Sequence, residues 1–270
     1  MTPQGELLYL YAVVAADDGT HAISDAPLGI DDRPITILTE GEVAAIVGNV
    51  PTSDFDEAPL NANLSQMEWL APRAEAHQRV NARVAERSAA SLPLSFGTIF
   101  RTEDSLRRML RERSAELAER LSAVRGCAEW VVTVRRDLAR AAASVEREDP
   151  VLTRAKSDLE AASPGRRYLL QRQLDELRRS AVRRADATVA SEVSDTATRV
   201  SRRIHAEPLV ASSEASAPVV ARLSALVERA GESQFRDAID RLNAQWHERG
   251  YDVERSGPWP VYRFSGSVRG

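Results

Sequence analysis

The sequence predicts a mixed protein of the α+β class, built as two domains. Its length of 270 residues is long for one compact domain and comfortable for two. Strand-like and helix-like periodicities occur in both halves. In the second half they follow the order strand, helix, strand, strand, helix, strand, which is the ferredoxin-like βαββαβ pattern with an enlarged first helix. We therefore expect an N-terminal α+β domain over residues 1–125 and a C-terminal ferredoxin-like domain over residues 126–270, with a long helix and a C-terminal Gly-Pro-Trp-Pro tail.

The composition supports two hydrophobic cores and indicates an intracellular protein. Hydrophobic residues make up 43% of the chain but aromatic residues only 5%, so the cores must consist mainly of Ala, Val, Leu and Ile. The N-terminus lacks the pattern of a signal peptide, and no apolar stretch reaches the ~18 residues that a membrane-spanning helix needs. The single cysteine, Cys127, precedes an apolar run and is expected to be a small buried residue. We expect a cytoplasmic protein that does not contact a membrane.

The first domain is expected to open with three strands. Residues 7–15 are rich in β-formers and aromatic residues. Residues 34–39 and 43–48 are short apolar runs, which a turn containing Gly41 would join into a hairpin. Residues 51–63 are polar and punctuated by proline, which indicates a loop.

Two helices and an extended segment are expected to complete the first domain. Apolar residues recur at helical spacing over residues 66–90, with a cap near Ser65. Residues 94–100 then resume an extended apolar run. Thr102 precedes acids in what would be the first turn of a second helix, where a hydroxyl cap and negative charge are both favourable. That helix would end at Gly126.

The second domain is expected to have a long first helix. Its apolar residues recur at spacings of three and four from about residue 168 to residue 205. This stripe could pair with another chain, but packing on the predicted sheet is the simpler use. Proline-containing breaks are expected at 149–150 and 163–165. In chain order, the other expected elements are a strand at 130–134, a helix at 137–147, strands at 209–212 and 219–227, a helix at 231–250 and a strand at 251–265 interrupted at Gly257.

Charge is distributed unevenly along the chain. Residues 1–60 hold eleven acids and one base, whereas residues 166–206 hold ten arginines and five acids. The two regions could dock on each other or present different faces to partners. The arginine-rich helix also raises an alternative function, a regulator that binds nucleic acid. A solvated helix face is the preferred interpretation, because acids interleave with the arginines, the net charge is -4 and only Tyr168 offers stacking.

The sequence lacks the usual patterns of catalytic and metal-binding sites. The four histidines are scattered, and one cysteine is too few for a recognisable zinc motif. No phosphate-binding loop, dinucleotide-binding fingerprint or nucleophile elbow occurs. His77 lies beside apolar residues on a predicted helix, where we expect a hydrogen-bonded structural histidine. We therefore predict no catalytic residue, no metal and no cofactor.

Three short segments are more specific than their composition requires. Residues 91–100 read Ser-Leu-Pro-Leu-Ser-Phe-Gly-Thr-Ile-Phe, with a glycine inside an apolar run. Residues 126–134 open a strand with an acid beside a tryptophan. In residues 257–264, two prolines hold an extended backbone around a tryptophan. The residues singled out are Leu92, Pro93, Leu94, Phe96, Gly97, Phe100, Glu129, Trp130, Gly257, Pro258, Trp259, Pro260, Tyr262 and Phe264.

In this order and spacing, the three segments resemble the gas vesicle protein family GvpF/GvpL. The first strand and the helix that contains Ala76 and His77 are similar in position, so the resemblance covers roughly residues 7–265. Two departures are Ser95, where a basic residue would be expected, and Val261, where a second proline is common.

The resemblance implies an accessory or minor structural protein for the formation of gas vesicles, the hollow protein shells that give cells buoyancy. It implies the hydrophobic shell protein GvpA as a partner, other gas vesicle accessory proteins as further candidates, and a location in the cytoplasm and on the gas vesicle. It implies no enzymatic activity. The motif residues are candidates for contact with the partner, although a place in the core is the commoner use of such side chains. Neither the oligomeric state nor the choice between an F-type and an L-type member follows from the sequence.

Overall fold

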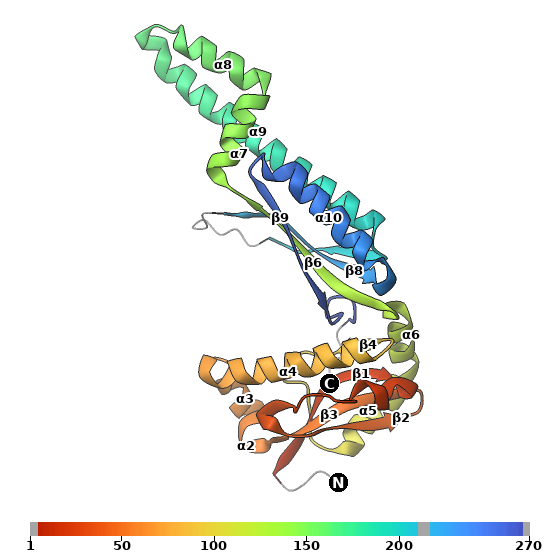
Figure 1. Ribbon diagram of the computed structural model, residues 1–270. Coiled ribbons are helices and arrows are strands. Elements are labelled where there is room, and N and C mark those ends of the chain that lie inside the picture. The colour runs from red at the N-terminus through yellow and green to blue at the C-terminus, as the bar shows by residue number, and fades with distance from the viewer. Residues whose placement is uncertain (1–4, 210–216, 267–270) are drawn as a thin grey trace. The chain divides into compact units, whose positions relative to one another are not determined.

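The computed structural model describes residues 5–209 and 217–266. Within these residues the chain forms two compact units, each with its own sheet (Figure 1). Unit 1 comprises residues 1–129 together with 258–270, and unit 2 comprises residues 130–257. The fold is thus the mixture of helices and sheets that the sequence predicts. The division lies close to the expected boundary at 125/126, but the C-terminal tail, expected in the second domain, belongs to unit 1.

Unit 1 is built on a five-stranded sheet. Its strands are β1 (Glu6–Ala15), β2 (Ile35–Glu40), β3 (Val43–Pro51), β4 (Ser91–Pro93) and β5 (Ile99–Phe100). They lie in the order β2-β3-β1-β4, and β5 also pairs with β1. The expected hairpin is confirmed, since β2 and β3 pair antiparallel and Gly41 in their turn has a φ of 60°. Glycine adopts this left-handed conformation without a Cβ penalty.

Helices supply much of the core of unit 1. They are α1 (Gly19–Ala22), α2 (Thr52–Phe55), α3 (Glu57–Asn63), α4 (Met67–Arg87), α5 (Glu103–Glu112) and α6 (Ser114–Val124). The apolar face of α4 packs Ala76, Val80 and Val84 into one cluster with Tyr9 and Tyr11 of β1. Because α6 also contacts β1, this strand is buried along nearly its whole length.

The segment 51–63, expected to be a loop, instead forms the two short helices α2 and α3. Phe55 at the end of α2 is buried and its ring lies 5.2 Å from that of Trp69. Asp56 then caps α3 by accepting a hydrogen bond from the backbone N–H of Glu57. The burial of one aromatic side chain and the N-cap of α3 therefore stabilise helices here, although the prolines in the sequence favoured a loop.

The helix ends of unit 1 partly follow the prediction. Thr102 caps α5 as expected, forming a reciprocal capping box with Ser105. Ser65 does not cap α4; its hydroxyl donates to the carbonyl of Ala62, and Gln66 is the N-cap residue. The helix expected to run without a break to Gly126 is interrupted at Arg113, between α5 and α6.

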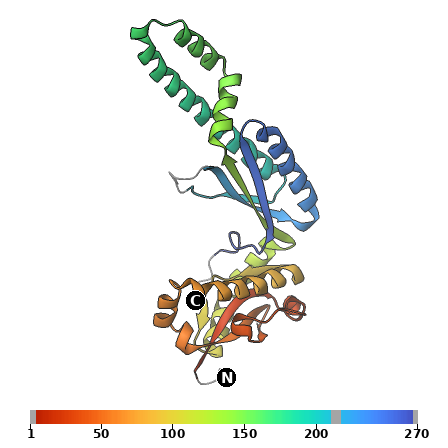
Figure 2. The same cartoon turned by 60° about the vertical axis from the view of Figure 1, so that its left-hand side comes forward.

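Unit 2 is built on a four-stranded sheet. Its strands are β6 (Cys127–Arg136), β7 (Arg203–Ala206), β8 (Val219–Glu228) and β9 (Tyr251–Trp259). They lie in the order β7-β8-β6-β9. The helices α9 (Pro164–Arg199) and α10 (Glu232–His247) lie on one face of this sheet (Figure 2). Val189 and Val193 of α9 and Phe235 and Ile239 of α10 share a core with Trp130 of β6.

Two further helices lie at the N-terminal side of α9. They are α7 (Leu138–Glu148) and α8 (Pro150–Glu160). α8 runs beside the first half of α9, and the pair extends beyond the sheet (Figures 1 and 2). A small core of Leu152, Leu174 and Ala181 joins them. We call this helical pair, residues 150–181, the arm.

Two features of unit 2 differ from the prediction, and a third is not tested. The prediction has a break at Asp149 and Pro150, where the structure has α8. Asp149 caps this helix and proline takes its first position, where no N–H is needed. α9 ends at Arg199, and residues 203–206, expected to be helical, form β7. The strand expected at 209–212 falls almost wholly outside the described residues.

Candidate functional site

Two of the segments singled out in the sequence, residues 91–100 and 257–264, meet in unit 1 at His77 of α4, and Glu129 of the third segment bonds to Arg263 there. In the first of them, the N–H of Leu94 donates to the carbonyl of Tyr11 over 2.8 Å. Gly97 has a φ of 83°, and its N–H donates to the Tyr9 hydroxyl over 3.1 Å. The ring of Phe96 lies 5.7 Å from the imidazole of His77. The glycine therefore lets the chain turn so that its backbone and an aromatic side chain both reach the same site.

His77 is buried, with 4% of its surface exposed, and is hydrogen-bonded on both sides. Its Nδ1 lies 2.9 Å from the Tyr9 hydroxyl, and its Nε2 lies 3.0 Å from Nδ2 of Asn81, one turn later on α4. We assign Asn81 as the donor to Nε2, which leaves Nδ1 to donate the ring proton to the Tyr9 oxygen. Tyr11 stacks on the imidazole at 5.9 Å between centroids. These contacts agree with the structural role predicted for His77.

Burial sets the charge state of the groups at this site. It lowers the pKa of His77 to about 4, so the imidazole is neutral at neutral pH. It raises the pKa of Tyr11 to about 12, and it raises the pKa of Tyr9 and of Tyr262. The site is therefore a set of neutral hydrogen-bonding groups. Such a set can orient and hold chain segments.

The C-terminal tail, residues 258–266, is one of the segments held there. The hydroxyl of Tyr262 donates to Oε1 of Gln78 over 3.0 Å and lies 3.4 Å from Nε2 of His77. The N–H of Arg263 donates to Oε2 of Glu129 over 2.8 Å. The guanidinium of Arg120 donates to the carbonyl of Ser265. With Val261 and Phe264 buried as well, the tail is part of unit 1, which explains why its place differs from the expected one.

The singled-out residues divide into buried and exposed ones. Among the described residues, the buried members are Leu92, Leu94, Phe100, Glu129, Trp130, Pro260 and Phe264, together with Pro93 of β4. Phe96, Gly97, Tyr262 and Gly257 are partly buried, whereas Pro258 and Trp259 are exposed. Trp130 lies in the core of unit 2, with its ring 5.7 Å from that of Phe235. Trp259 keeps 43% of its surface exposed and is the large apolar side chain of the three segments that a partner could reach.

Glu129 is expected to hold the tail in place. Its buried carboxylate accepts from a backbone N–H, and removing the acceptor would leave that donor without its bond. We expect Glu129→Ala to speed amide hydrogen exchange of residues 260–265 about tenfold. This factor corresponds to a loss of about 1–2 kcal/mol in the free energy of local opening. Glu129→Gln keeps an acceptor oxygen and should change the exchange less. Equal exchange in all three proteins would contradict this role.

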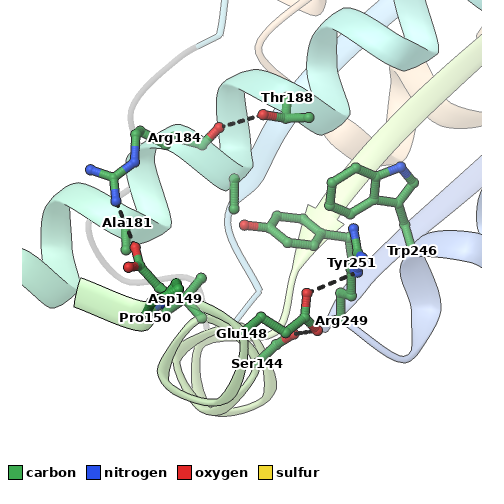
Figure 3. A pocket seen from close by; sticks show the side chains of 12 residues that line it. Ser144, Glu148, Asp149, Pro150, Ala181, Arg184, Thr188, Trp246, Arg249 and Tyr251 are labelled. Atoms are coloured by element: carbon green, nitrogen blue, oxygen red, sulfur yellow. Dashed lines mark hydrogen bonds and ion pairs between the residues drawn. The ribbon is translucent and has the colours of Figure 1, made fainter. Parts of the chain in front are cut away.

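A second concave site lies in unit 2, where the arm meets the sheet. It is a pocket of about 420 Å³ between α7, α9 and the end of α10, with Trp246 and Tyr251 on one side (Figure 3). Two ion pairs border it, Arg184 with Asp149 at 2.8 Å and Arg249 with Glu148 at 3.3 Å. The guanidinium of Arg249 also lies 5.2 Å from the centre of the Trp246 ring. Since the charges are paired with one another, they fix the base of the arm.

Sequence reasoning missed the pocket because its residues come from three distant segments, 144–150, 181–188 and 246–251, with no shared spacing. The part of the chain that the structure describes holds no group of three or more side chains suited to bind a metal ion. In the same residues, no helix is long and apolar enough to span a membrane. Cys127 is buried and not in a disulfide, as predicted.

Relatives along nearly the whole chain are found among known proteins. The family model described as "Gas vesicle synthesis protein GvpL/GvpF" matches residues 7–266. Gas vesicle protein L of Streptomyces sp. (strain CB03234) is 32% identical over 275 residues, covering 96% of this chain and 93% of that protein. Gas vesicle protein F of the same strain is 28% identical over 256 residues, covering 95% and 98%. The resemblance inferred from the three segments is thereby confirmed.

Two solved structures of GvpF proteins have a similar fold. The crystal structure of GvpF from Anabaena sp. PCC7120 superposes with a TM-score of 0.74 at 13% identity, covering 98% of this chain and 100% of that chain. GvpF from Microcystis aeruginosa superposes with a TM-score of 0.65 at 15% identity, covering 96% and 98%. At these identities the likeness concerns the fold alone.

Proposed function

The chain belongs to the GvpL/GvpF family of gas vesicle synthesis proteins, and on that premise we propose that it is an accessory protein that binds the hydrophobic shell protein GvpA and assists its assembly. The observation that carries the proposal is the family match over residues 7–266, which includes all three segments singled out in the sequence. The protein then acts in the cytoplasm and on the gas vesicle, by contact with other proteins and without catalysis. Other gas vesicle accessory proteins are further candidate partners.

The physical need for such a protein follows from the shell subunit. A protein that exposes large apolar surfaces aggregates unless another surface covers them. A cover of this kind needs aromatic or aliphatic side chains within a polar rim. Trp259 supports the proposal, because the adjacent prolines restrict its backbone and the rest of the tail is fixed to unit 1 by the bonds of Tyr262 and Arg263. A rigid, half-exposed tryptophan is well suited to anchor an interface.

Co-expression with GvpA tests the proposal. We expect the shell protein to stay soluble and to co-purify with this chain. Trp259→Ala should weaken the complex at least about tenfold, because tryptophan side chains at the centre of an interface often contribute 2 kcal/mol or more. Leu138→Ala is the matched control, since Leu138 is similarly exposed, at 51%, but lies on α7 outside the three segments. GvpA that remains insoluble and fails to co-purify would argue against the function itself.

We also infer that unit 2 is a ferredoxin-like domain. The inference is supported by its element order, β6, helices, β7, β8, α10 and β9, and by its strand order β7-β8-β6-β9. In that description α7, α8 and α9 together replace the first helix, and the arm is an insertion into it. Superposition of an experimental structure of this chain on ferredoxin-like domains would test the assignment.

A further inference from the structure

The end of the arm carries an excess of positive charge that the fold does not neutralise. Residues 150–172 include five bases and two acids. Further along α9 the arginines are paired, as in Arg179 with Glu176 at 2.8 Å and Arg184 with Asp149 at 2.8 Å. Within the described residues, no ion pair includes any of the five bases of residues 150–172, which are Arg154, Lys156, Arg166, Arg167 and Arg172. This region of the arm, residues 150–172, is called the arm tip below.

The arm tip also exposes large apolar side chains. Tyr168 and Leu169 are 68% and 67% exposed, although the arm already has its own core around Leu152 and Leu174. On a helix, residues three and four apart lie on one side, so Arg172 is next to both Tyr168 and Leu169. Exposed aromatic and aliphatic side chains flanked by unpaired cations are typical of a contact surface for an acidic partner.

A complementary surface occurs on unit 1 of the same protein. Residues 17–32 hold five acids and no lysine or arginine. Asp31 is paired with Arg73 at 2.9 Å and Asp25 with Arg87 at 3.7 Å, so these two pairs reduce the negative charge of the segment but leave it acidic. At the centre of the loop formed by residues 25–32, Leu28 is 52% exposed, with Asp25 and Asp32 on either side. Both aspartates have positive φ, so the loop is held in an unusual conformation. The N–H of Ile30 fixes the loop by donating to the buried Tyr11 hydroxyl over 2.8 Å.

We propose that the arm tip of one copy binds the 25–32 loop of a second copy. The two surfaces have opposite charge, and each offers an exposed apolar side chain to the other, Leu28 on the loop and Tyr168 with Leu169 on the tip. Because the two surfaces are different, the contact is head-to-tail. Each copy keeps one free tip or loop for the next copy, so the association continues as a chain unless it closes into a ring. The proposal goes beyond the contact with GvpA and does not depend on it.

Sedimentation velocity of the full-length protein tests the contact. At low ionic strength we expect the average mass to rise with protein concentration, and at about 0.5 M salt, where charges are screened within a few ångströms, we expect a monomer. Two variants each remove one surface. The tip variant carries Arg166→Glu, Arg167→Glu and Arg172→Glu; the loop variant carries Asp25→Asn, Leu28→Ser and Asp32→Asn. Asparagine tolerates the left-handed backbone at these positions, so the two aspartate substitutions add no backbone strain. Asp25→Asn also removes the ion pair with Arg87, at 3.7 Å, which is exposed on both sides.

The mixing of the two variants gives the decisive result. Each variant alone should self-associate at least about tenfold more weakly than the original protein. An equimolar mixture should form 1:1 dimers but nothing larger, because the tip variant supplies only a loop and the loop variant supplies only a tip. Arg199→Glu, which reverses an exposed arginine on α9 outside the arm tip, should leave self-association unchanged.

Several outcomes would overturn the proposal. One is a monomer at every concentration and salt. Another is association that survives in the loop variant, which would mean that tips bind tips. A third is a tip that binds anionic lipid vesicles or an oligonucleotide while the protein stays monomeric, which would assign the basic surface to a different partner. Equal unfolding temperatures for the original protein and all variants would show that the substitutions change the contact surfaces and not the stability of the fold.

Discussion

Replacing Gly250 with alanine should destabilise unit 2 by more than about 3 kcal/mol, the largest effect that we expect from any single methyl group in the protein. Gly250 lies between α10 and β9 with a φ of 84°. A Cβ there would lie 2.4 Å from the backbone nitrogen of Ala141 and 2.8 Å from the carbonyl carbon of Arg140. The left-handed backbone alone costs an alanine about 1–2 kcal/mol, and the start of α7 would have to move as well.

A control variant separates the cost of the left-handed backbone from the cost of the steric clash. Gly126→Ala is the control for backbone strain, because Gly126 also has a positive φ, of 68°, but no atom lies within 4 Å of the added Cβ. We expect urea unfolding to show a loss of about 1–2 kcal/mol for Gly126→Ala and a clearly larger loss for Gly250→Ala. Hydrogen exchange of peptides from α7 and β9 would locate the second loss in unit 2. Equal losses in the two variants would mean that α7 yields to the methyl group at no cost.

The elements that local chemistry determines are the ones that the sequence predicts well. β1 needs only its run of β-formers, and α5 needs only Thr102 to begin it. The hairpin needs the glycine of its turn. By contrast, α2 depends on a pocket for Phe55 that Trp69 helps to form, and α8 depends on α9 as a surface to pack on. Such contacts between distant residues leave no periodic signal in the segment itself.

The candidate site shows the same division. The sequence identifies the residues, since Gly97 and Tyr262 lie in segments more specific than their composition requires. Their meeting point could not be predicted, because His77 is 68 residues from Tyr9 and 185 residues from Tyr262. The tail was expected to continue the last strand of the second domain. Hydrogen bonds to Gln78 and Glu129 fix it on unit 1 instead.

Acidification should destabilise unit 1 through His77, and this is the second large effect that we expect. The pKa of His77 is lowered to about 4 in the folded protein because the imidazole is buried, whereas an exposed histidine has a pKa of about 6.5. Between these two values the unfolded chain binds a proton that the folded protein does not. The contribution of the neutral, buried imidazole is therefore complete above about pH 6.5, falls as the pH falls, and is lost by about pH 4. It amounts to about 3 kcal/mol.

A neutral substitution isolates this contribution from that of the many carboxylates. His77→Gln keeps hydrogen-bonding capacity toward Tyr9 and Asn81 but has no proton to gain. The free energies of unfolding of the original protein and of the variant are to be measured in urea between about pH 4 and about pH 7. The value for the original protein minus that for the variant should be about 3 kcal/mol lower at pH 4 than at neutral pH. His205→Gln, which replaces an exposed histidine on β7, is the control for the substitution itself. A difference that stays constant over this range would show that the imidazole takes up its proton as readily in the folded protein as in the unfolded chain, and the ring beside the tail would then be charged below about pH 6.5.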